Sequence, residues 1–259
     1  MRVLYLGLEG DDVIAWQNFL RGISPRSNVV ANGTFDATTK LWTQTFQRAS
    51  SISADGIVGP MTLSKALALG FNPLVDVRLD QNGPNWPAKP AGVTQMSPNE
   101  RAATFGTFAF VPAPLKNNPE AINITDGWVS ENIVTIQIPQ LEKLHASQVQ
   151  FHKLIAPQVQ GLFTAWEEAG LIDKIITWGG SWVPRYVRGS RTYLSNHSWG
   201  TAFDINAQWN MLGVQPALFG QHGSVRELVE IAYEYGMFWG GHYPTRPDGM
   251  HFECYKLIP

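Results

Sequence analysis

Ser195-Asn196-His197-Ser198-Trp199-Gly200-Thr201-Ala202-Phe203-Asp204 places a histidine and an aspartate seven residues apart, and Asp248-Gly249-Met250-His251-Phe252-Glu253 adds a second histidine near the C-terminus. Two histidines and an aspartate are a ligand set that Zn²⁺ uses in catalytic sites, where the fourth position stays open for water. Asp248 precedes the second histidine by three residues, and it can handle the proton of that water. The two motifs predict a hydrolytic zinc site at His197, Asp204 and His251.

The spacing within the first motif predicts its local structure. An odd spacing on one strand would put His197 and Asp204 on opposite faces. One continuous helix would bring them together, but Gly200 argues against it. We therefore expect a loop at His197, a turn at Trp199-Gly200 and a strand that returns Asp204 beneath the metal, with His251 on a C-terminal strand.

The sequence around these motifs mixes strand and helix signals. Because they do not alternate regularly, the predicted fold class is α+β. We expect Pro157 to kink or split the longer of the two helices. The predicted strands cover residues 108–111, 133–138, 175–178, 203–206 and 250–254, and the predicted helices cover 148–169 and 225–235.

Residues 1–71 have the pattern of a separate small domain of three helices, over 12–20, 38–47 and 60–69. The second helix is expected to bury Leu41, Trp42 and Phe46. The segments between the helices form an internal repeat: Asn32-Gly33-Thr34-Phe35 is matched 23 residues later by Asp55-Gly56-Ile57-Val58. Each copy predicts a tight turn, one apolar residue pinned inward and the start of a helix.

Residues 72–104 are rich in proline and glycine and show no periodicity, which predicts a semi-rigid linker with one short helix over 98–103. The predicted organisation is therefore a small domain (1–71), a linker (72–104) and a second domain (105–259).

Composition excludes several classes of partner. The net charge of −2 argues against a nucleic-acid partner, which would require a basic stripe. No apolar run is long enough for a membrane span, so no stable membrane insertion is expected. The N-terminal residues do not resemble a secretory signal. The expected state is a monomer.

The first domain resembles the peptidoglycan-binding domain of bacterial and phage wall hydrolases, and the competing interpretation is a three-helix bundle without a ligand. Asp36 departs from the family, which usually has glycine there. The resemblance implies bacterial peptidoglycan as the partner. The matching residues are Gly10, Val13, Gln17, Leu20, Asn32-Gly33-x-Phe35, Thr38, Phe46-Gln47 and Asp55-Gly56-x-Val58-Gly59-x-x-Thr62.

Residues 106–257 resemble the superfamily of zinc D-alanyl-D-alanine carboxypeptidases and L-alanyl-D-glutamate endopeptidases, in its phage endolysin branch. The motifs are Ser195-x-His197-x-x-Gly200-x-Ala202-x-Asp204, Asp248-x-x-His251 and Trp239-Gly240-Gly241-His242. The resemblance implies a Hedgehog-type peptidase fold with an antiparallel sheet. It also implies zinc on His197, Asp204 and His251, with Asp248 as general base.

Further residues are candidates for contact with the substrate. In this superfamily an arginine upstream of the Ser-x-His motif grips the substrate, which implicates Arg185 or Arg188; Arg185 is favoured, and Arg188 has pairing with a surface acid as its alternative. Ser195 is expected to hold substrate polar groups or to orient the His197 loop. Trp239 and His242 are assigned to the substrate cleft, with a supporting role near the metal as the alternative for His242. Glu253 either orients His251 or is a structural carboxylate.

Three functions remain open. The first is a modular endolysin-like hydrolase that cuts a stem-peptide amide bond, L-alanyl-D-glutamate, and that is made in the host cytoplasm and reaches the wall through a pore or by injection. The second is a D-alanyl-D-alanine carboxypeptidase acting on wall precursors. The third is a wall-binding protein with a structural metal.

Overall fold

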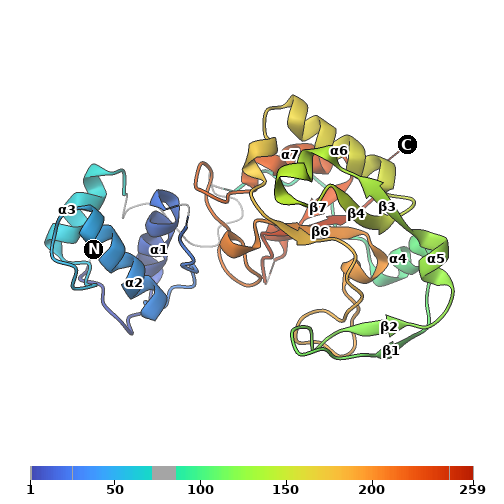
Figure 1. Ribbon diagram of the computed structural model, residues 1–259, viewed down its shortest axis with the longest axis horizontal. Coiled ribbons are helices and arrows are strands. Elements are labelled where there is room, and N and C mark those ends of the chain that lie inside the picture. The colour runs from blue at the N-terminus through green and yellow to red at the C-terminus, as the bar shows by residue number, and fades with distance from the viewer. Residues whose placement is uncertain (1, 25, 72–85, 245, 259) are drawn as a thin grey trace. The chain divides into compact units, whose positions relative to one another are not determined.

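The computed structural model describes residues 2–24, 26–71, 86–244 and 246–258 (Figure 1). The chain forms two compact units. One comprises Met1–Pro87, Gln208–Arg226 and Tyr243–Met250, and the other comprises Ala88–Ala207, Glu227–His242 and His251–Pro259. Helices and antiparallel sheets are both present, so the predicted α+β class is confirmed. Residues 72–85, most of the first half of the predicted linker, lie outside the described residues.

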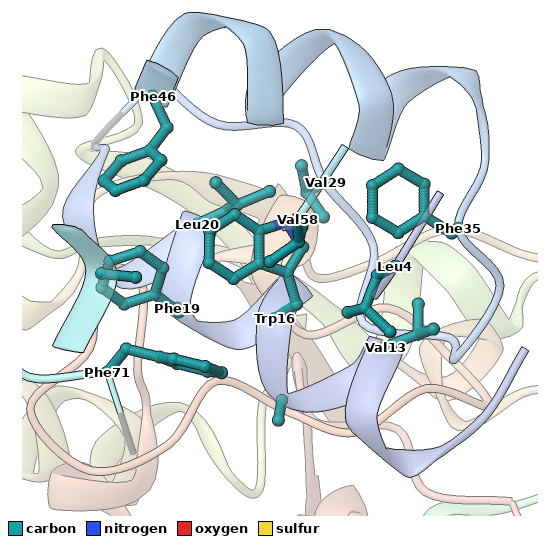
Figure 2. Close-up of a cluster of buried hydrophobic side chains, with 12 residues drawn as sticks. Leu4, Val13, Trp16, Phe19, Leu20, Val29, Phe35, Phe46, Val58 and Phe71 are labelled. Carbon is teal, nitrogen blue, oxygen red and sulfur yellow. The ribbon is translucent and has the colours of Figure 1, made fainter. Parts of the chain in front are cut away.

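Three helices form the N-terminal part of the chain, as predicted: α1 (Asp11–Ile23), α2 (Ala37–Ala49) and α3 (Pro60–Ala68). Trp16 lies in the middle of their core, within 5.6 Å of the rings of Phe19, Phe46 and Phe71 (Figure 2). The indole N–H of Trp16 donates to Thr43 Oγ1 at 2.9 Å, which satisfies its one polar atom. The expectation that Leu41 is buried is wrong, since its side chain is 55% exposed and α2 turns Thr39, Thr43 and Phe46 inward instead.

The predicted internal repeat is also a repeat of hydrogen bonds. In the first copy, Gln17 Oε1 accepts from Gly33 N, and Gln17 Nε2 lies within 3.1 Å of Asn32 Oδ1, Thr34 O and Thr39 Oγ1. In the second copy, Gln47 makes the same four contacts. Its partners are Gly56 N, Asp55 Oδ1, Ile57 O and Thr62 Oγ1.

Each glutamine thus ties one helix to the following turn and to the start of the next helix. Gly33 and Gly56 have positive φ angles of 80° and 76°, as the tight turns require. Phe35 and Val58 are buried, as predicted. Asp36 accepts a 2.7 Å hydrogen bond from Thr39 N and so caps α2, which gives a structural role to the departure from the family's glycine.

The second unit is built around a four-stranded antiparallel sheet in the order β5-β6-β8-β7. Helix α6 packs beside α7, and α7 lies against β7 (Figure 1). Phe203 of β6 stacks on Phe252 of β8 with ring centroids 5.4 Å apart, and Trp166 of α6 packs edge-on against both. The sheet strands are β5 (Trp178–Gly180), β6 (Ala202–Ile205), β7 (Met237–Trp239) and β8 (His251–Cys254), and the helices are α6 (Ala156–Glu168) and α7 (Val229–Glu234).

Two hairpins and two short helices complete this unit. The predicted helix at 98–103 is α4, which Ser97 and Glu100 cap reciprocally. Strand β3 pairs with β4, and β1 pairs with β2. Their bounds are α4 (Pro98–Phe105), β1 (Phe110–Pro112), β2 (Ile122–Ile124), α5 (Trp128–Asn132), β3 (Ile133–Gln137) and β4 (Gln148–His152). The 3₁₀ turns of the described residues, two of which cross the division between the units, are Pro139–Leu144, Ile172–Lys174, Asn196–Trp199, Ala207–Trp209, Arg226–Leu228 and Gly240–His242.

The helix predicted over 148–169 is wrong in its first part. Gln148–His152 is strand β4, where Val149 and Phe151 point inward in the two-residue period of a strand. Pro157 does not kink the helix but occupies its first turn, where the missing N–H costs nothing.

Other element boundaries also differ from prediction. Ile176 and Thr177 precede β5, because their N–H groups donate to the Asn206 side chain rather than to a neighbouring strand. The first strand begins at Phe110 instead of residue 108. The predicted 225–235 helix is a 3₁₀ turn (Arg226–Leu228) followed by α7. Among the residues that the structure describes, no helix is long and apolar enough to cross a membrane.

Replacing Gln47 tests the repeated arrangement. Gln47→Leu leaves the buried N–H of Gly56 without its acceptor, so we expect a loss of about 1–3 kcal/mol in the free energy of unfolding, measured by urea denaturation. Gln44→Leu, three residues earlier on the same helix and only partly buried, is the matched control. Equal effects of the two substitutions would contradict the arrangement.

His152 predicts acid sensitivity of the second unit. It is buried against Phe105 and Trp128, and burial lowers its pKa to about 4. The unfolded chain therefore binds more protons than the folded chain between roughly pH 6.5 and 4, so stability falls as the pH drops through that range.

His152→Asn keeps an acceptor for Leu154 N but does not titrate. We expect the melting temperature of this variant to fall less than that of the wild type between pH 7 and pH 4. His145→Asn, at an exposed position, should follow the wild type. Parallel curves for all three proteins would show that His152 does not contribute.

Candidate metal centre

The pairing of β6 with β8 places two of the predicted ligands directly opposite each other. Asp204 on β6 is the register partner of His251 on β8. His197 lies in the 3₁₀ turn Asn196–Trp199, which leads into β6 through Gly200 in the left-handed conformation (φ 65°). A Cβ at Gly200 would lie 2.9 Å from the backbone nitrogen of His152, so only glycine permits this close return. The loop, turn and strand expected from the motif are all present.

Three donor atoms of these residues converge. His197 Nε2 and His251 Nδ1 are 3.2 Å apart, and Asp204 Oδ1 lies 3.2 Å from the first and 2.9 Å from the second. Donors held at about 2.0–2.1 Å around a tetrahedral ion stand about 3.3 Å from one another. The triangle is therefore close to the size that one zinc ion requires, and among the described residues these three form the group that could hold a metal.

The second nitrogen of each imidazole faces an acceptor. His197 Nδ1 lies 2.6 Å from Ser181 O, which favours a proton on Nδ1 and leaves Nε2 as the donor to a metal. His251 Nε2 lies 3.5 Å from a carboxylate oxygen of the buried Glu253, on the side of the ring away from Asp204. Such partners fix the tautomer and orientation of metal-binding histidines. The geometry favours the orienting role over the purely structural one for Glu253.

The pKa values of Asp204 and His251 indicate that the site favours a positive charge. Burial by itself would raise the pKa of Asp204, but the charge of His197 and hydrogen bonds with His197 and His251 hold it well below its usual value. Burial alone would lower the pKa of His251, yet the hydrogen bonds to Asp204 and Glu253 raise it to about 10. Two carboxylates, the buried Glu253 and the partly buried Asp204, thus flank one imidazole. The mixed nitrogen and carboxylate donor set fits Zn²⁺ better than Mg²⁺, which prefers oxygen donors.

Arg185 is tied to the loop that carries His197. Ser198 Oγ accepts from Arg185 N at 3.0 Å and donates to Arg185 O at 2.8 Å, and Ser195 N donates to the same carbonyl. Arg188 instead forms an ion pair with Glu120 at 2.6 Å. The Arg185 backbone is therefore held beside the His197 turn. Arg188 instead forms the ion pair with a surface acid that was the alternative to substrate contact.

The remaining predicted site residues lie in different surroundings. Trp239 is fully buried in β7, opposite Phe252. His242 is buried, and its Nδ1 lies 2.7 Å from the hydroxyl of Tyr233, whose pKa is raised by burial. Ser195 precedes the His197 turn and is also buried. Asp248 is half-buried in the segment Tyr243–Met250, directly before β8.

The sequence motifs did not reveal every residue that supports the site. The acceptor for His197 Nδ1 is the main-chain carbonyl of Ser181, and any residue type supplies such a carbonyl. Ser198 lies inside the first motif, so its position was a usable signal. Glu120 is 68 residues from Arg188 and carries no local pattern.

Two family models match parts of the chain. Residues 188–254 match a family model described as D-alanyl-D-alanine carboxypeptidase, and residues 9–65 match one described as a putative peptidoglycan binding domain. The chain carries a peptidoglycan-binding domain followed by a peptidase domain. The first match includes His197, Asp204, Asp248 and His251, and the second spans both glutamine arrangements. No curated protein matches the chain. Together the two domains support a peptidase that acts on peptidoglycan.

Glu253 provides a test of the metal centre. Glu253→Gln keeps an acceptor near His251 Nε2 but removes the negative charge that makes the imidazole a stronger donor. We expect zinc affinity to fall about 10–100-fold, measured by competition with a chromophoric chelator. Cys254→Ala, the buried neighbour that contacts Gln158 and Lys256, should leave zinc affinity unchanged. Equal affinities in all three proteins would exclude a role for Glu253.

Proposed function

We propose that this protein is an endolysin-like peptidoglycan hydrolase that cuts a stem-peptide amide bond, L-alanyl-D-glutamate, with zinc as its metal. The observation that carries the proposal is the triangle of donor atoms from His197, Asp204 and His251, 2.9–3.2 Å apart, in a chain that also has a peptidoglycan-binding domain.

The chemistry divides between the metal and the chain. When bound, zinc lowers the pKa of a coordinated water to about 7 and polarises the scissile carbonyl. Asp248 accepts a proton from the attacking water and passes it to the leaving amine. Arg185 supplies positive charge for the oxyanion that develops on the substrate. The partners of the second imidazole nitrogens, Ser181 and Glu253, hold the two histidines in the orientation that ligation needs.

Substrate recognition is assigned to three further residues. Ser195 is proposed to bind polar groups of the stem peptide beside the His197 turn. Trp239 and His242 are proposed to shape the cleft, with Tyr233 fixing the ring of His242. Arg188 contributes through its ion pair with Glu120, which steadies the segment that follows Arg185.

The N-terminal domain raises the local concentration of substrate. Tethering to the wall makes each encounter with a stem peptide effectively intramolecular, so a weak affinity of the peptidase site is sufficient. We propose that a monomer works in this way at the cell wall, after synthesis in the host cytoplasm and release through a pore or by injection.

The family description favours one alternative, a D-alanyl-D-alanine carboxypeptidase. A carboxypeptidase must recognise a free C-terminal carboxylate, whereas an endopeptidase must leave that end of the cleft open. Digestion of purified sacculi followed by mass spectrometry separates them. We expect new N-terminal D-glutamyl ends, and release of D-alanine alone would establish the carboxypeptidase.

Asp248→Ala tests the catalytic assignment. We expect loss of sacculus lysis in a turbidity assay, because the water loses its proton acceptor, while zinc content and wall binding stay at wild-type levels. A variant that still lyses sacculi would contradict the role of Asp248. Wild-type protein that binds the wall and zinc but never lyses sacculi would favour the third candidate, a wall-binding protein with a structural metal.

A further inference from the structure

We propose that Asn210 is a positioning residue for Asp248. It belongs to a segment, residues 209–226, that we call the platform and that contributes none of the three proposed ligands. The proposal rests on the catalytic role of Asp248 put forward above, and it assigns to the platform the task of holding the turn that carries this carboxylate.

Asn210 joins three parts of the chain. Its side chain is fully buried, with Oδ1 accepting from Ala217 N at 3.1 Å and Nδ2 donating to Gly223 O at 2.8 Å. Its main-chain carbonyl accepts a 3.0 Å hydrogen bond from Met250 N. Met250 lies two residues after Asp248 and immediately before the ligand His251. Asn210 therefore connects the interior of the platform to the short segment between base and metal ligand.

Gly249 rests directly on the platform. A Cβ at this position would lie 2.6 Å from two ring carbons of Pro216, which is closer than real Cβ contacts allow, and 3.1 Å from Asn210 Cβ, which is a tight contact. On the other side of Asp248, Pro247 O accepts a 2.7 Å hydrogen bond from Gly213 N. The platform thus contacts the residue before Asp248 and both residues after it, so the Asp248 backbone has little freedom to move.

The platform is itself tightly held. Arg226 is almost fully buried, and it donates through Nε to Ala217 O at 2.7 Å and through Nη2 to Pro216 O at 2.8 Å. The guanidinium lies 4.4 Å from the ring centroid of Trp86, within the range of a cation–π contact. Arg226 therefore fixes the two residues, Pro216 and Ala217, on which Gly249 and Asn210 depend.

This arrangement separates two tasks. The metal ligands come from the His197 turn and strands β6 and β8, whereas the position of Asp248 is set by the platform. A general base must lie within hydrogen-bond reach of the proton it takes, and a displacement of about 1 Å can cost about 100-fold in rate. Damage to the platform should therefore lower the turnover number without weakening zinc binding.

The test uses the full chain loaded with zinc and a soluble stem-peptide fragment as substrate. We expect Asn210→Ala and Gly249→Ala each to lower kcat by about 10–100-fold, with KM and chelator-measured zinc affinity within about twofold of wild type. In Gly249→Ala/Pro216→Gly the clashing ring carbons are gone while the carbonyl that Arg226 binds remains, so at least tenfold of kcat should return. Gly127→Ala, where the nearest neighbour of the new Cβ is 3.8 Å away, should behave as wild type.

Two results would overturn the proposal. One is an unchanged kcat in both Asn210→Ala and Gly249→Ala while Asp248→Ala is inactive, which leaves the proposed function standing. The other is a parallel loss of zinc affinity and kcat in Gly249→Ala with no recovery in the double variant. Full activity of Asp248→Ala would instead remove the proposed function, and the role of the platform with it.

Discussion

The antiparallel pairing of β6 with β8 is the constraint on which the metal centre depends. It sets Asp204 opposite His251, two residues that are 47 positions apart in the chain, with donor atoms 2.9 Å from each other. A one-residue slip in this register would turn the ligands to opposite faces. The stacked rings of Phe203 and Phe252, the neighbours of Asp204 and His251, are the adjacent pair in the same register. Core packing and ligand placement therefore specify the same strand alignment.

Because the site is largely buried, the charges of its carboxylates favour binding of a cation. Asp204 and Glu253 bring two carboxylates to one buried imidazole, and a buried negative charge is costly unless it is paired. A divalent cation with its three ligands and Glu253 would balance the charge of both carboxylates. Without a positive partner these carboxylates would lower the stability of the folded chain. The same carboxylates therefore favour metal binding.

The two sequence motifs predicted the loop, turn and strand around His197 and Asp204, because the positions of glycine and of the ligand residues restrict the local backbone. Gly200 indicated the sharp turn between His197 and Asp204. The turns that Gln17 and Gln47 bind were visible in the sequence as a repeat with a spacing of 23 residues. The helix predicted over 148–169 is wrong over Gln148–His152, because Val149 and Phe151 lie two residues apart, which is the period of a strand and not of a helix, and this segment pairs with β3. The platform was not predicted, because Asn210 and Arg226 bind main-chain groups there, and any residue type supplies such groups.

The most direct test of the account is the metal itself. Freshly purified protein should contain about one zinc per chain. The metal should be removed by a chelator together with sacculus lysis, and both should return when zinc is added back. His197→Ala and Asp204→Ala, each purified as a folded protein, should carry almost no zinc. A folded wild-type protein that lyses sacculi equally well with and without the chelator, and that contains no stoichiometric metal, would contradict the central claim.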